Sequence, residues 1–112
     1  MYRKAFVPNP ATRFSAEKVR EIAGEMVYVC DTPIFDDVMG DGYKNRFEDR
    51  VKVSMQDFDY QQDVLVFFGD ILILSMMMIS AALDDEVKYI DIARYSKYSD
   101  SYITKRVNVD DL

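Results

Sequence analysis

Acidic residues follow two apolar segments of the chain, and carboxylates in such positions have the chemistry of a metal or phosphate site. Asp31 comes directly after the segment 26–30, and Asp70 comes shortly after the segment 63–68. Ligands of open α/β sheets bind at the carboxyl ends of the strands. If the two segments form neighbouring strands, the carboxylates of Asp31 and Asp70 would converge and hold Mg²⁺. The candidate ligand residues are Asp31, Thr32, Gly69 and Asp70.

The same residues also allow a purely structural interpretation. Asp31 would make a turn, and Asp70 would cap the apolar helix that follows it, where a carboxylate also meets the positive end of the helix dipole. A phosphate enzyme would normally add a lysine or a glycine-rich backbone cradle, and the sequence has neither motif here. Asp31 and Asp70 are therefore weak metal candidates.

The segment 37–48 has part of the pattern of a calcium-binding loop. Acids stand at its first, fifth and twelfth positions and a glycine at its sixth. Its third position is Met39, which has no oxygen ligand, and Lys44 occupies a position that is usually apolar. The segment before it predicts a strand instead of the required helix. We therefore expect a connecting loop that runs into a helix, without bound calcium.

Two residue types limit the possible chemistry further. The chain of 112 residues has no histidine and one cysteine, Cys30. This composition excludes Ser-His-Asp and Cys-His catalysis, histidine-ligated metal sites and an internal disulfide. The sequence predicts no cofactor and leans away from an enzyme.

The net charge of -6 limits the possible partners. It disfavours direct binding to nucleic acid and to an anionic membrane surface, and it favours a basic protein partner. Two groups of residues are candidates for such an interaction, an acidic group in the polar loop and a tyrosine group near the C-terminus. They are Asp36, Asp37 and Asp41, and Tyr95, Tyr98 and Tyr102. For the tyrosines the alternative is cross-strand packing.

The apolar segment 64–83 is long enough to span a membrane. Gly69 and Asp70 interrupt it, and the two halves differ in composition. The first half is β-branched and aromatic, which is typical of a strand. The second half is rich in Leu, Met and Ala, which favours a helix. We predict a buried strand, a turn and a helix, in a cytoplasmic protein without a signal peptide.

The remaining elements follow from periodicity and from turn residues. Pro8 and Pro10 exclude a helix near the start, so residues 1–14 are predicted to form an extended arm. Ser15 is expected to cap a short helix that ends at Gly24. An apolar stripe that starts at Tyr43 predicts an amphipathic helix. The predicted helices span 16–23, 43–58 and 71–83, and the predicted strands span 26–30, 63–68, 87–95 and 102–109.

This order predicts one small, three-layer, Rossmann-like α/β domain over residues 1–112. Its mainly parallel sheet would have about four strands, with a C-terminal antiparallel edge hairpin. The strand 26–30 would be covered on both faces, and the strand 102–109 would lie at an edge. The helix 71–83 is apolar on every side, which favours an oligomer or partner interface, or else burial between the sheet and the N-terminal arm.

Residues 26–107 resemble small Rossmann-like proteins of tailed bacteriophages whose function is not characterised. The resemblance lies in two strands that end in acids, an amphipathic helix, an apolar helix and a final hairpin. It implies a viral accessory protein that acts in the host cytoplasm by binding a host protein or enzyme. The leading hypothesis is therefore a non-catalytic, acidic protein-interaction module. The alternative is a nucleotide- or phosphate-binding protein, or a Mg²⁺-dependent enzyme, with its site at Asp31 and Asp70.

Overall fold

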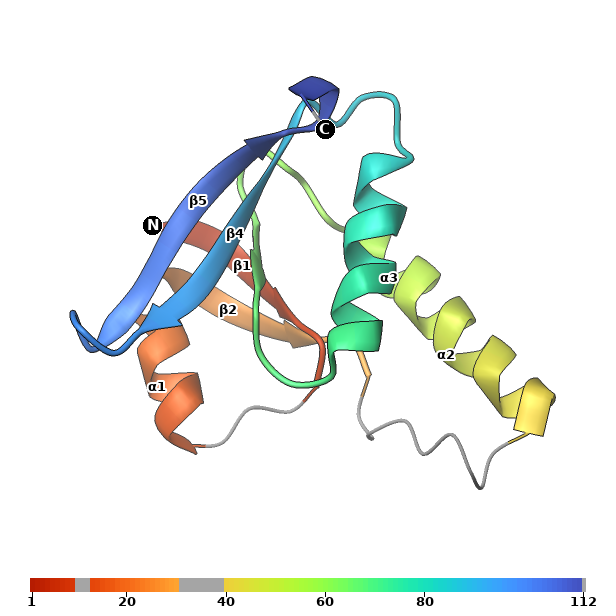
Figure 1. The fold of residues 1–112 in the computed structure, drawn as a ribbon, viewed down its shortest axis with the longest axis horizontal. Helices are drawn as coiled ribbons and strands as arrows, with labels where there is room; N and C mark the ends of the chain where they lie inside the picture. The colour runs from red at the N-terminus through yellow and green to blue at the C-terminus, as the bar shows by residue number, and fades with distance from the viewer. Residues whose placement is uncertain (10–12, 31–39, 112) are drawn as a thin grey trace.

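Five strands form a single sheet in the order β2-β1-β3-β4-β5 (Figure 1). The computed structural model describes residues 1–9, 13–30 and 40–111, and for 13–15 and 40–47 it describes the backbone alone. β2, β1, β3 and β4 pair with one another in parallel, and β5 pairs with β4 in the antiparallel direction. The mainly parallel sheet with an antiparallel edge hairpin is therefore confirmed. The strands are β1 Tyr2–Val7, β2 Ala23–Tyr28, β3 Val64–Val66, β4 Tyr89–Ser96 and β5 Ser101–Asn108.

The N-terminal segment contributes the strand that the sequence did not predict. Residues 1–14 were expected to be an extended arm, but Tyr2–Val7 is β1, and it lies between β2 and β3. Ala5, Phe6 and Val7 have no exposed surface. The burial of these three apolar side chains explains why the segment takes an inner position in the sheet. The strand ends at Val7, directly before Pro8.

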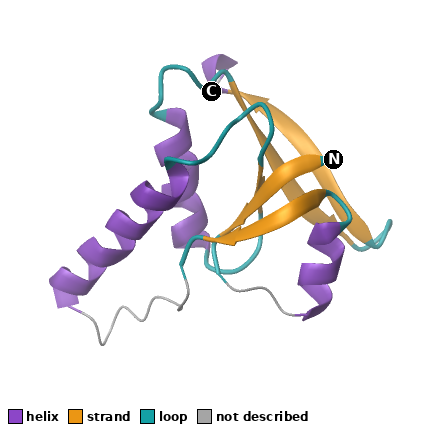
Figure 2. Ribbon diagram, turned by 180° about the vertical axis from the view of Figure 1, so that it is seen from behind, coloured by secondary structure: helices purple, strands orange, loops and turns teal. Residues whose placement is uncertain are grey.

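Helices cover both faces of the sheet (Figure 2), as the three-layer prediction requires. Helix α1 packs with Val19 against one face, beside Ala5, Val7 and Val64. Helices α2 and α3 pack against the other face and against each other. The helices are α1 Arg13–Arg20, α2 Gly40–Met55 and α3 Ile71–Ala82, and a short 3₁₀ turn, η1 Val109–Asp111, follows β5.

Two local predictions near the start differ from the structure. Helix α1 begins at Arg13, so Ser15 lies inside the helix instead of capping it, and Gly24 lies within β2. Strand β2 is an edge strand with several exposed positions, although the apolar segment 26–30 suggested a strand covered on both faces. The difference arises because β1 takes the inner position beside β3.

The segment 64–83 forms a strand, a turn and a helix, as predicted. β3 is completely buried, and α3 buries Ile73, Leu74 and Met77. The N-terminal segment does not cover α3, because that segment is β1. Within the described residues, no helix is both long and apolar enough to cross a membrane.

The predicted apolar stripe of α2 is confirmed where its side chains are described. Val51 and Met55 are buried in the core between α2, α3 and the sheet. Phe58 extends this stripe beyond the helix and meets the ring of Phe6 edge to face, with the ring centroids 5.4 Å apart. The side chains of Tyr43 and Phe47 lie outside the described residues.

Candidate functional site

The predicted Mg²⁺ site assumed that the strands before Asp31 and Asp70 are neighbours in the sheet. β1 lies between β2 and β3, so the strands that precede Asp31 and Asp70 are not neighbours. The assumption of neighbouring strands is therefore wrong, and the shared carboxylate site stays a prediction. Asp31 and Thr32 themselves lie outside the described residues, as do Asp36 and Asp37. Asp41 lies in α2, with its backbone alone described.

Asp70 acts as the cap of α3. Its Oδ1 accepts hydrogen bonds from the backbone N–H of Leu72 at 2.8 Å and of Ile73 at 3.4 Å. These are two of the N–H groups that the first turn of a helix leaves without a partner. Among the described residues, no group of three acids or cysteines is placed to hold a metal ion. The geometry at Asp70 supports the structural interpretation of this residue.

The sequence interpretation missed Asn9, which follows β1 at the point where the strand order reverses. Asn9 is buried, and its Oδ1 accepts a hydrogen bond from the backbone N–H of Asp70 at 2.7 Å. Gly69 has a φ of 85°, and a Cβ built on it would stand 2.8 Å from that Oδ1. The Asn9 side chain therefore connects the end of β1 to the turn between β3 and α3 through a hydrogen bond.

The tyrosines of the hairpin have different environments. Tyr95 and Tyr102 face each other across β4 and β5, with their ring centroids 5.9 Å apart, and Tyr102 is buried. This is the cross-strand packing that was the alternative to a binding surface. Tyr98 is fully exposed in the turn. The Tyr95 hydroxyl donates to Asp100, which also pairs with Lys18 of α1.

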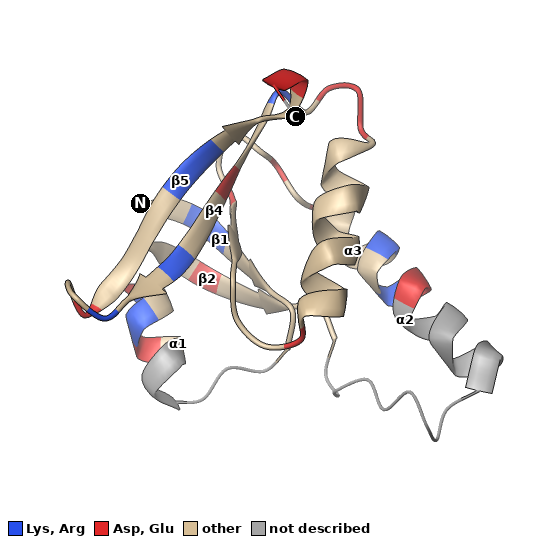
Figure 3. Cartoon of the chain, in the orientation of Figure 1, with Lys and Arg blue, Asp and Glu red and all other residues tan. Residues whose placement is uncertain are grey.

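A groove runs between α2 and α3 with a volume of about 350 Å³. Ile79 and Leu83 of α3 lie along it and are 59% and 77% exposed. Glu48 and Lys52 of α2 stand at its rim. Figure 3 shows α3 without a charged residue along its length and acidic residues directly after it. The groove is therefore an apolar surface with an acidic end.

Four residues of α3 and its end form one exposed face, which we call the α3 stripe. They are Ile71, Ser75, Ile79 and Leu83. Their spacing of four residues places them on one side of the helix. The hydroxyl of Ser75 donates to the backbone carbonyl of Ile71 at 2.8 Å, so its polar group is satisfied within the helix. The α3 stripe therefore presents an almost entirely apolar surface to solvent.

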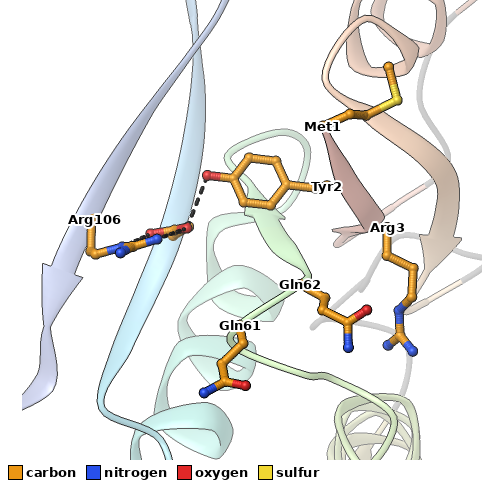
Figure 4. A pocket seen from close by; sticks show the side chains of 7 residues that line it. Met1, Tyr2, Arg3, Gln61, Gln62 and Arg106 are labelled. Carbon is orange, nitrogen blue, oxygen red and sulfur yellow. Dashed lines mark hydrogen bonds and ion pairs between the residues drawn. The ribbon is translucent and has the colours of Figure 1, made fainter.

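A second hollow, with a volume of about 490 Å³, lies at the amino end of β1 (Figure 4). Asp91 of β4 is 4% exposed there and receives three hydrogen bonds. Arg106 donates from Nε at 2.9 Å and from Nη2 at 3.1 Å, and the Tyr2 hydroxyl donates at 3.0 Å. The guanidinium carbon of Arg106 also stands 3.8 Å from the centroid of the Tyr89 ring. Arg106 is therefore held in one orientation.

Arg106 and Tyr2 both have a raised pKa in this hollow. The hydrogen bond to Asp91 raises the pKa of Arg106, so its charge is permanent. Burial is the main cause that raises the pKa of Tyr2. A hydrogen bond with Thr104 acts in the opposite direction, and the hydrogen bond to the Asp91 carboxylate adds to the rise. The Tyr2 hydroxyl is therefore a hydrogen-bond donor at neutral pH.

A second arginine lines the same hollow and is held in the same way. Arg3 donates from Nε and Nη2 to the two carboxylate oxygens of Asp63, at 3.0 and 2.8 Å. Asp63 is completely buried and also accepts a hydrogen bond from the backbone N–H of Asp59. Sequence reasoning missed both arginine pairs, because each joins residues that only the strand register brings together.

Comparisons with known proteins found no matching family model, no similar curated protein and no similar solved structure. The resemblance to small bacteriophage proteins therefore stays a prediction.

Proposed function

We propose that this chain is a non-catalytic protein-interaction module that binds a basic, amphipathic helix of a partner protein in the groove between α2 and α3. The observation that carries the proposal is the exposed α3 stripe. Exposed apolar patches of this kind mark protein–protein interaction sites, and a groove between two helices suits the apolar face of a third. Met76 also lines the groove, and a flexible methionine adapts to an irregular partner surface.

The charges around the groove determine the chemistry of the partner. Asp84, Asp85 and Glu86 are exposed directly after Leu83, and the rim has one charge of each sign, on Glu48 and Lys52. A partner helix with lysines or arginines beside its apolar face would meet these carboxylates. A second copy of this chain would bring the same acids to the interface, so a basic partner is favoured over the predicted self-association through α3.

Two synthetic helical peptides test the proposal directly. Both have the same leucine pattern, and one has lysine and the other glutamate at every polar position. We expect the lysine peptide to bind the full chain in fluorescence anisotropy and to bind more weakly as salt is added. We expect the double variant Ile79→Ser/Leu83→Ser to bind it about tenfold more weakly, because two apolar contacts are lost.

The matched control is Val53→Ser. Val53 is an exposed apolar residue of α2 that does not line the groove. Its substitution should leave peptide binding unchanged. The proposal is wrong if Val53→Ser weakens binding as much as the double variant does, or if the glutamate peptide binds equally well. A dimer in light scattering that Leu83→Ser dissociates would assign the groove to a second copy.

A further inference from the structure

We propose that the hollow at the amino end of β1 binds a small dicarboxylate, with one carboxylate at Arg3 and the other at Arg106. This site shares no residue with the groove between α2 and α3. Its volume of about 490 Å³ lies in the range of small-molecule sites. The residues that line it are Met1, Tyr2, Arg3, Gln61, Gln62, Asp91 and Arg106.

The hollow follows from the shortness of β3. The strand pairing between β1 and β3 begins at Ala5 and Val64. Before it, the backbone N–H of Arg3 donates to the carbonyl of Gln62 at 2.8 Å, and Tyr2 has no backbone partner on this side among the described residues. Beside Tyr2 and Arg3 the chain forms a turn that holds Gln61 and Gln62 instead of a longer strand. The side chain of Tyr2 reaches across to β4, where its hydroxyl meets Asp91. A notch therefore remains between the ends of β1 and β4.

The cationic member of each ion pair faces this notch, while each pair as a whole carries no net charge. The side chain of Arg3 is 43% exposed and that of its partner Asp63 is 0% exposed. For Arg106 and Asp91 the values are 55% and 5%. Each carboxylate is thus buried behind its guanidinium, and the cation is the member of the pair that faces solvent. Two fixed guanidinium groups are well suited to carboxylates, because little side-chain entropy is lost on binding.

Hydrogen-bonding capacity remains in the hollow after these pairs form. Each arginine uses Nε and Nη2 for its aspartate, and Nη1 of both makes no hydrogen bond to the described residues. Gln61 and Gln62 use their Nε2 groups as donors within the turn, which leaves their Oε1 atoms as acceptors. The site therefore offers donors for two carboxylates and acceptors for a hydroxyl or amino group between them.

The placement of the arginines selects a ligand with two charged ends. Figure 4 shows Arg106 and Arg3 on opposite sides of the hollow, with Gln61 and Gln62 between them. A dicarboxylate can offer one carboxylate to each arginine, and a ligand with a single carboxylate cannot.

Succinate is the probe, and three compounds are its controls. Butyrate keeps one carboxylate, succinamide keeps the shape without charge, and inorganic phosphate supplies a compact anion. Binding to the full chain is followed at constant ionic strength by the ¹H–¹⁵N signals of the arginine Nε–H groups. We expect succinate to shift the signals of both Arg3 and Arg106 and to bind about tenfold more tightly than butyrate. Succinamide should produce no shift.

Two matched variants keep both ion pairs intact. Gln61→Glu adds a negative charge to the hollow, and Gln56→Glu adds the same charge at an exposed position outside it. We expect Gln61→Glu to weaken succinate binding about tenfold or more and Gln56→Glu to leave it unchanged. The proposal is overturned if succinate shifts neither arginine, if butyrate or phosphate binds as tightly, or if the two variants behave alike.

Discussion

Arg106 on β5 lies directly across the sheet register from Asp91 on β4 and holds its buried carboxylate with two hydrogen bonds. Removal of one member of such a pair leaves the other without compensation in a buried place.

The variant Arg106→Ala should therefore lose stability. We expect the free energy of unfolding to fall, by less than for a fully buried pair, because Arg106 is half exposed. Urea denaturation measures the change. The neighbouring exposed Lys105→Ala should change stability by less than about 0.5 kcal/mol. The double variant Asp91→Asn/Arg106→Gln should recover part of the loss. An equal loss in the Lys105 variant would contradict this account.

Gly69→Ala should be destabilising because of both its backbone conformation and its surroundings. Its φ of 85° is strained for alanine, and the new Cβ would stand 2.8 Å from Asn9 Oδ1. We expect a loss of about 1–3 kcal/mol in thermal or urea unfolding. Gly24→Ala is the matched control, since a Cβ there would meet Arg3 O at an ordinary 3.4 Å. Equal effects of the two substitutions would show that the contact with Asn9 is unimportant.

Asp70 provides a test between the capping and metal interpretations. Asp70→Ala should cost about 1 kcal/mol because α3 loses its cap, and Asp70→Ser should restore most of that stability. Mg²⁺ and nucleotides should leave the melting temperature of the natural chain unchanged. A ligand present at a hundred times its dissociation constant would add about 2.7 kcal/mol. A Mg²⁺-dependent shift that Asp70→Ala abolishes would restore the metal hypothesis.

The contact between Tyr95 and Asp100 should depend on pH. The hydrogen bond from Tyr95, followed by that from Lys18, lowers the pKa of Asp100, and the same bond raises the pKa of Tyr95. The ionised Asp100 therefore stabilises the fold at pH values above the ordinary aspartate pKa. This contribution is lost as the pH falls through the lowered pKa. The protonated Tyr95 stabilises the fold at pH values below the ordinary tyrosine pKa. This contribution is lost as the pH rises through the raised pKa.

A carboxyl ¹³C titration of Asp100 measures the acidic side of this dependence. In Tyr95→Phe the pKa of Asp100 should rise toward its ordinary value, because the larger of its two stabilising hydrogen bonds is gone. Ser101→Ala alters a neighbouring residue and should leave the pKa unchanged. If the Asp100 titration is the same in Tyr95→Phe as in the natural chain, the hydrogen bond does not operate in solution.

The sequence predicted the elements whose apolar pattern is continuous. β3, α3 and the hairpin have long apolar or alternating segments, and their positions were found within a few residues. β1 was missed because Arg3 and Lys4 interrupt a segment with only a few apolar residues. The charge of Arg3 is compatible with the sheet because Asp63, sixty residues later, neutralises it. Such compensation is invisible before the strand order is known.

The candidate sites could also be predicted only where they depend on residues that are close together in the sequence. The cap at Asp70 could be predicted, because a carboxylate before an apolar helix is a local pattern. The hollow between Arg3 and Arg106 could not be predicted from the sequence, because it depends on the register of β4 with β5 and on the length of β3. The exposed side of α3 could not be separated from its buried side, because the helix is apolar all round and periodicity gives no signal.

The inner position of β1 has a consequence for how the chain is made and folded. β1 can pair with β2 after a short local crossover through α1. The opposite edge of β1 has no partner until β3 is made, because Ala5 and Phe6 pair with Val64 and Leu65. Until Val64–Val66 has been synthesised, the edge of β1 that will face β3 stays open to pairing with other strands. We therefore expect a fragment that contains β1 and β2 but ends before β3 to aggregate more readily than residues 1–112 do.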